Sequence, residues 1–233
     1  MIGYTDNAFD GYPGFIGATP APLAPGSSEL IDLPYEKRQI RESSGASEYQ
    51  DGDLRIVGNE DLHVLRTEPI PSGFRAFVCD STLNVYKQAA GATQFAPLKL
   101  QAQVLPTDAD NMKVWRIEFS DRDPRVDPNQ PDASKPQQGP LPAPLTDVFG
   151  NWFVTGRESV AGWSNAGGPG LIPNSPEDRQ LTRDSLNAEN EMRQQCFARY
   201  PLSADERAKR ANTVLASPPP VDPAVPGWPE AGS

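Results

Sequence analysis

Two cysteines, Cys79 and Cys196, and one histidine, His63, are the residues of this 233-residue chain best suited to nucleophilic or metal chemistry. A nucleophilic cysteine needs a base within hydrogen-bond reach, and histidine is the usual one. His63 lies in the run DLHVL, which predicts a strand, and alternation places it on the face opposite Leu62 and Val64. We therefore expect an edge or exposed histidine. A catalytic pair of His63 and Cys79 would require that their two strands are neighbours and that both side chains lie on the same face of the sheet.

Metal and cofactor sites are not predicted. Zinc sites draw on Cys and His residues at short spacing, and positions 79 and 196 are far apart. The acidic runs TDADN and DRDPRVDPNQPD could attract calcium, but neither has the Gly and terminal Glu of an EF-hand loop, so we interpret them as a turn and a linker. The motifs GxSxG, GxGxxG, HExxH and the phosphate-binding loop do not occur. The sequence thus indicates no catalytic, metal or cofactor residues, although a carboxylate pair on neighbouring strands would leave no signature.

The cysteines have two remaining interpretations. Cys79 shares a strand face with Phe77, and Cys196 lies with Met192 on the apolar stripe of a predicted helix, so both point inward. They are either separate small hydrophobic residues in a reducing compartment or one disulfide that ties the helix to the sheet. The compartment decides between these alternatives.

The elements that position these residues are mostly strands. Alternating hydrophobicity across residues 52–121 predicts an α+β, mostly β domain, built as an antiparallel meander or small sandwich of about five to seven strands. The run FRAFVCDSTLNVYKQ, residues 74–88, predicts a strand, a two-residue turn and a second strand. A further strand is expected at 148–156. In PLKLQAQV, Leu98, Leu100, Ala102 and Val104 share one face.

One β-layer is expected to hold the core, because alternation must be consistent across a sheet with one wet face. The residues expected to be buried together are Phe77, Val85, Leu98, Leu100, Trp115, Ile117 and Phe119.

Two C-terminal helices carry clear start signals. SPED places Ser175 at the N-cap, a proline at the first helical position and two carboxylates in the first turn, which predicts a helix over 176–199. SADE is a capping box at Ser203 and predicts a second helix over 203–215. A short helix is expected within 33–43.

Proline usage divides the chain, because the 26 prolines cluster near both ends and in the middle. We interpret residues 1–50 as an extended N-terminal arm and 217–233 as an extended C-terminal arm. Residues 51–216 form a single β-rich domain with a Pro-rich connector at 121–145. A purely disordered arm would carry fewer aromatic residues, so the arms are expected to order on another surface. Their anchors would be Tyr4, Phe9, Tyr12, Phe15 and Trp228.

Composition restricts the partners. The formal net charge of −10 gives nucleic acid no broad basic face to bind. No apolar run is long enough for a bilayer, so membrane insertion is not expected. The first residues lack the features of a signal peptide, so export is not expected if Met1 is the initiator, and it stays open if the chain is a trimmed mature form.

Three hypotheses follow. The first is a non-enzymatic structural subunit of a virion-like or cytoplasmic assembly, whose arms contact protein subunits of the same or another kind. The second is a secreted cell-envelope binding domain with a Cys79–Cys196 disulfide. The third is a hydrolase with an unrecognised carboxylate site. The Ala-, Pro-, Asp- and Arg-rich composition is typical of a high-GC actinobacterial genome or one of its phages, and the sequence favours assembly over envelope binding.

Overall fold

The computed structural model describes residues 13–21, 33–38, 40, 55–98, 111–127, 129, 138–141, 143–164, 175–200, 202–223, 225 and 227–230. The elements are α2 (Tyr35–Arg38), β1 (Arg55–Ile70), β2 (Gly73–Gln88), β3 (Ala96–Pro97), β4 (Met112–Ser120), β5 (Phe153–Ser159), α3 (Pro176–Phe197) and α4 (Ala204–Asn212). The chain is α+β and mostly β, as predicted.

The strands form one antiparallel meander with the order β1-β2-β4-β5, and β3 pairs with the far end of β2. The expected hairpin within 74–88 is wrong, because β2 is a single strand of 16 residues. The turn lies just before it, at residues 71–72, and ends at Gly73 with φ +151°. A Cβ atom at Gly73 would lie 2.2 Å from the Phe119 carbonyl oxygen, so the close approach of β4 requires glycine there.

Polar residues in the middle of β2 explain why the strand continues. Asp80, Ser81 and Thr82 are buried, where a turn would be exposed. The Trp115 indole donates to Asp80 Oδ2 at 2.7 Å, and the Thr82 hydroxyl donates to the Leu98 carbonyl oxygen at 3.2 Å. Because neighbouring segments satisfy these groups, polar side chains are tolerated inside a buried strand.

The core lies on a different face of β4 from the predicted one. The register pairs Phe77 with Arg116 and Cys79 with Val114, and residues directly opposite one another share a face. The core cluster beneath α3 consists of Phe77, Cys79, Met112, Val114, Val160, Met192, Cys196 and Phe197.

The predicted grouping of Trp115, Ile117 and Phe119 with Phe77 is therefore wrong. The three β4 residues are half-buried on the opposite face. Val85 and Leu98 are buried, as expected, whereas Leu100, Ala102 and Val104 lie outside the described residues.

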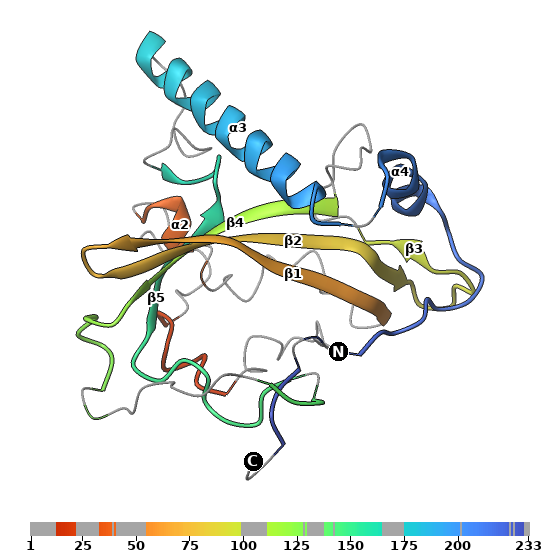
Figure 1. Cartoon of the computed structure of the whole chain (residues 1–233), viewed down its shortest axis with the longest axis horizontal. Coiled ribbons are helices and arrows are strands. Elements are labelled where there is room, and N and C mark those ends of the chain that lie inside the picture. The colour runs from red at the N-terminus through yellow and green to blue at the C-terminus, as the bar shows by residue number, and fades with distance from the viewer. Residues whose placement is uncertain are drawn as a thin grey trace.

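Both long helices start where the sequence predicts. The Ser175 and Ser203 side chains each accept from the third helical residue's backbone N–H, and that residue's carboxylate accepts from the serine N–H in return. The helices end at Phe197 and Asn212, slightly earlier than expected. The buried residues of α3 begin only at Ser185, and Figure 1 shows that its first half projects beyond the sheet.

The described parts of both arms pack against the chain's own domain. The Val154 N–H donates to the Ala18 carbonyl oxygen at 2.7 Å, which attaches residues 13–21 to β5. The Phe15 ring lies 6.0 Å from the Phe149 ring. Figure 1 shows these segments on the side of the sheet opposite α3 and α4.

The C-terminal segment is fixed at two places. Trp228 and Leu141 exchange backbone hydrogen bonds of 2.8 and 3.1 Å, and Asn59 exchanges side-chain bonds with the backbone of Asp222. Phe15 and Trp228 are thus in contact with their own chain, while Tyr4, Phe9 and Tyr12 lie outside the described residues. Across the part of the chain that is described, no helix is both long and apolar enough to cross a bilayer.

Candidate functional site

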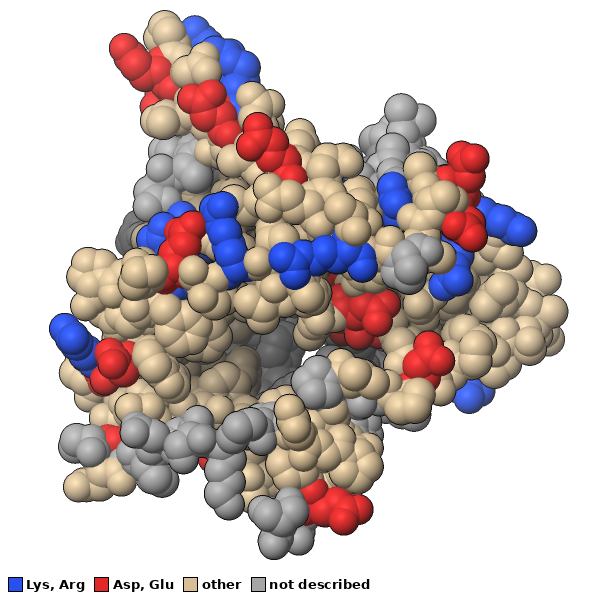
Figure 2. All heavy atoms as spheres, in the orientation of Figure 1, with Lys and Arg blue, Asp and Glu red and all other residues tan. Residues whose placement is uncertain are grey.

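A pocket of about 370 Å³ opens between β1 and the link that joins α3 to α4. Its polar lining consists of Asp61, His63, Asn84, Arg199, Tyr200 and Arg210. The volume falls near the lower end of the range for small-molecule sites. Figure 2 shows that acidic and basic side chains meet on this face, below the C-terminal end of α3.

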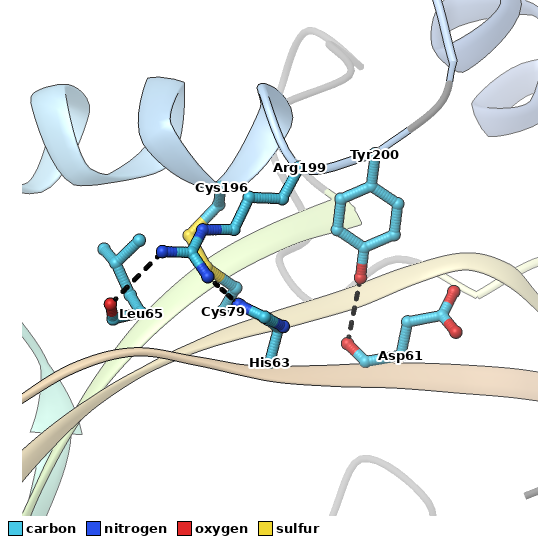
Figure 3. The surroundings of a disulfide bond; sticks show 7 residues. All are labelled: Asp61, His63, Leu65, Cys79, Cys196, Arg199 and Tyr200. Carbon is cyan, nitrogen blue, oxygen red and sulfur yellow. Dashed lines mark hydrogen bonds between the residues drawn. A yellow bond between two sulfur atoms is a disulfide. The ribbon is translucent and has the colours of Figure 1, made fainter. Parts of the chain in front are cut away.

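The Cys79–Cys196 disulfide positions one wall of the pocket. It joins β2 to the last turn of α3 with a Cα–Cα distance of 5.7 Å, and neither cysteine is exposed to solvent. Arg199 and Tyr200 follow Cys196 almost directly, so the bond holds both side chains over β1, as Figure 3 shows.

Arg199 spans the upper side of the pocket. Its guanidinium contacts His63 Nε2 and donates to the Leu65 carbonyl oxygen at 3.4 Å. Arginine has no acceptor atom, so Nε2 of His63 is the acceptor in this contact. The register places His63 opposite Cys79 on the neighbouring strand, as a catalytic pair would need. Because the Cys79 sulfur is bonded to Cys196, it is no free nucleophile in this structure.

Tyr200 and Asp61 form the centre of the pocket. The Tyr200 hydroxyl donates to the Asp61 backbone oxygen at 3.1 Å, and burial raises the pKa of this phenol. Burial is also the main reason that the pKa of the Asp61 carboxyl is raised, and the nearby Asp222 adds to it. The Arg210 guanidinium donates to the Asn84 side-chain oxygen at the other end of the pocket.

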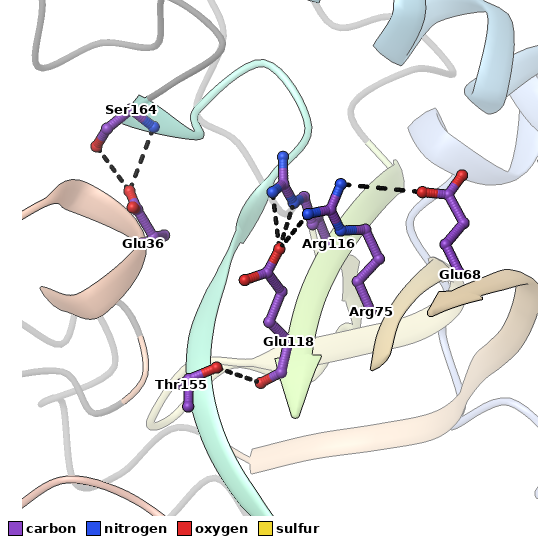
Figure 4. Close-up of polar contacts among 7 residues, drawn as sticks. All are labelled: Glu36, Glu68, Arg75, Arg116, Glu118, Thr155 and Ser164. Carbon is purple, nitrogen blue, oxygen red and sulfur yellow. Dashed lines mark hydrogen bonds and ion pairs between the residues drawn. The ribbon is translucent and has the colours of Figure 1, made fainter. Parts of the chain in front are cut away.

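A second charged cluster, drawn in Figure 4, is built from side chains of β1, β2 and β4. The Glu118 carboxylate accepts from Arg116 at 2.7 Å and from Arg75 at 2.9 Å. Arg75 also lies 3.9 Å from Glu68, and Arg116 stacks over the Trp163 ring at 3.9 Å. The carboxylates neutralise the positive charges of these guanidiniums, so we interpret the cluster as a structural link between β1, β2 and β4.

Asp80 and Glu60 are the carboxylate pair on neighbouring strands that sequence alone could not identify. The two carboxyl groups interact, and Glu60 is one of the groups that lower the pKa of Asp80 against the effect of burial. Burial is the largest cause of the raised pKa of Asp80. Only 4% of Asp80 is exposed, which favours a structural role over contact with a substrate.

Of the predicted anchors, Phe15 and Trp228 do not line the pocket, and the other three lie outside the described residues. Among the described residues, no group of three or more His, Cys, Asp or Glu side chains is placed to hold a metal ion. No motif in the sequence singles out Arg199 and Arg210 as pocket residues. Their only sequence signal is position, because one directly follows α3 and the other lies in the last turn of α4. Their convergence depends on long-range packing, which no local pattern encodes.

Comparison of the chain with protein-family models, with curated proteins and with solved structures finds no match. The pocket and the disulfide are therefore the features that bear on function.

Proposed function

We propose that this chain is a non-enzymatic binding domain that works outside the cytoplasm, as a secreted or cell-envelope protein. The disulfide between Cys79 and Cys196 carries the proposal. Protein disulfides persist in oxidising compartments and are rare where glutathione and thioredoxin keep thiols reduced. Both sulfurs are buried in the core cluster, which suits a permanent structural bond better than a catalytic or regulatory one.

Two further features support binding as the function. The bond fixes the wall of a pocket whose side chains offer donors and acceptors without a nucleophile and base in contact. The described parts of the arms pack against the chain's own domain. These parts therefore have a binding surface within the same chain and need no neighbouring subunit for it.

The test is to trap thiols in living source cells with a membrane-permeant alkylating reagent and then map the native protein without reduction. We expect a linked pair of peptides containing Cys79 and Cys196 and recovery of the protein from the envelope or culture fluid. Alkylation of both cysteines, with the protein in the cytosol, would refute the proposal. A control sample reduced before alkylation must show both peptides modified.

A structural subunit of a multi-chain assembly is the second candidate. The observation that favours it is the exposure of Val221 and Val225, at 69% and 88%, on the C-terminal segment. Apolar side chains on an otherwise fixed segment are suited to contact with protein subunits. Sedimentation of the native protein in a cell extract tests this candidate: a large particle supports it, and a monomeric species contradicts it.

A further inference from the structure

We propose that the pocket binds a small ligand through an oxyanion, a carboxylate or phosphate group, held between Arg199 and Arg210. This inference rests on the proposed binding function and adds the chemical class of the ligand. Arg199 belongs to the link between α3 and α4, Arg210 lies in the last turn of α4, and both line the same pocket.

The hydrogen-bond partners of these arginines are neutral, although Arg210 also acts electrostatically on the Asp61 and Glu206 carboxylates. Arg199 contacts the His63 ring and the Leu65 carbonyl oxygen, and Arg210 donates to the Asn84 amide oxygen. Neither arginine belongs to an ion pair within the described residues. Two guanidiniums and one carboxylate, Asp61, line the pocket, so its lining carries more positive than negative charge. In a chain with a net charge of −10, such a local excess of positive charge favours an anionic ligand.

The chemistry of guanidinium supports an oxyanion in particular. Its planar set of donors matches the geometry of carboxylate and phosphate, and such charge-assisted bonds are stronger than bonds to neutral acceptors. An entering oxyanion would therefore compete with the carbonyl, imidazole and amide acceptors that the arginines now use. Asp61 lines the same pocket and would oppose an anion, but its raised pKa reduces this opposition under mildly acidic conditions.

The disulfide prepares the site in advance. Arg199 lies just after the bonded residue Cys196, and its guanidinium already contacts β1. A side chain held in place before binding loses less conformational entropy when the ligand arrives.

His63 supplies the readout, because it is the one histidine in the sequence and it contacts Arg199. The oxidised full-length protein is titrated with sodium phosphate and, separately, with sodium acetate, at constant pH and ionic strength maintained with sodium chloride. The imidazole signals are followed by NMR. We expect a saturable shift with at least one of the two oxyanions, and the arm that saturates identifies phosphate or carboxylate as the preferred group.

Arg210→Gln should weaken the apparent affinity by about tenfold or more, because it removes a charge-assisted contact. Arg122→Gln is the matched control, since it makes the same charge change on an arginine outside the pocket, and it should leave the affinity within about twofold. Arg210→Lys is a second variant, which keeps the positive charge and so controls for misfolding of Arg210→Gln. Its affinity for the oxyanion should lie between those of the native protein and Arg210→Gln.

The inference would be overturned if the NMR shifts rise linearly with the concentration of both oxyanions. It would also be overturned if Arg122→Gln and Arg210→Gln weaken the apparent affinity equally. This failure is distinguishable from failure of the proposed function. A chain that has the native disulfide outside the cytoplasm but lacks saturable oxyanion binding refutes the ligand class alone.

Discussion

At the scale of single residues, Asp80 is the most unusual side chain of the sheet. It lies in the interior of β2, accepts a bond from the Trp115 indole, and interacts with Glu60 of the neighbouring strand. Two cations, Lys113 and Arg157, lie 3.8 and 3.9 Å from the centre of the same indole ring. The bond from Trp115 satisfies Oδ2, but Oδ1 is buried without a hydrogen-bond partner, so burial of the charged carboxylate is costly.

Asp80→Asn should increase stability at neutral pH. The folded protein holds the Asp80 proton more tightly than the unfolded chain. The native protein therefore loses unfolding free energy as the pH rises from the unfolded pKa of 3.8 through the raised pKa of the folded state. Asparagine keeps an acceptor for Trp115 and offers a donor to Glu60 without a charge. In urea titrations between pH 4 and 7.5, the free energy of unfolding of Asp80→Asn should exceed that of the native protein by an amount that grows with pH. A variant that is no more stable than the native protein at pH 7.5 would contradict this account.

Met112 tests which face of β4 holds the core. Its side chain is 1% exposed beneath α3, so Met112→Ala should lower the free energy of unfolding by about 2 to 5 kcal/mol. Leu186→Ala is the control on the exposed side of α3, where 49% of the residue is accessible, and it should cost less than about 0.5 kcal/mol. Equal losses in denaturant titrations would show that the core lies elsewhere.

At the scale of elements, the sequence predicted the parts whose signals are local. The capping boxes at Ser175 and Ser203 contain their own hydrogen-bond partners within three residues, so both helix starts were predictable. The long β2 strand was not, because Asp80 and Thr82 look like turn residues until their partners on distant segments are known. The pocket likewise depends on register and helix docking, which a single sequence does not determine.

Replacing both cysteines by serine tests the contribution of the disulfide to the attachment of α3. The bond closes a loop with a sequence separation of 117, so the double variant should lose about 4 to 5 kcal/mol of unfolding free energy in the chain-entropy model. Chemical denaturation under non-oxidising conditions measures the loss. The native protein with a reducing agent should match the variant, and unchanged stability in both samples would mean that the core alone holds α3.

At the scale of the whole molecule, the C-terminal segment is part of the domain rather than a free arm in its described portion. Its bonds to Asn59 and Leu141 connect the far end of the chain to β1 and to the Pro-rich connector. The segment nevertheless contributes little to the core cluster beneath α3, which contains none of its residues. Local release of this segment should therefore be separable from global unfolding.

Trp228→Ala should release the segment without melting the sheet. Trp228 is half-buried where its backbone pairs with Leu141, so loss of the ring should make residues 217–230 more sensitive to brief proteolysis. The unfolding free energy of the sheet and α3 should stay within about 1 kcal/mol of the native value, because distant regions contribute independently. Mass spectrometry of the fragments locates the cuts. Cleavage at the native rate would contradict the anchoring role of Trp228.

The disulfide also determines how the molecule would carry mechanical load. If the chain were pulled from its two ends, tension would pass from β2 directly into the last turn of α3, and the intervening loop would bear no force. With a sequence separation of 117 residues and about 3.4 Å per extended residue, roughly 400 Å of chain would stay hidden from stretching until the bond is reduced. The protein would thus stretch as a short tether in oxidising surroundings and lengthen sharply in reducing ones.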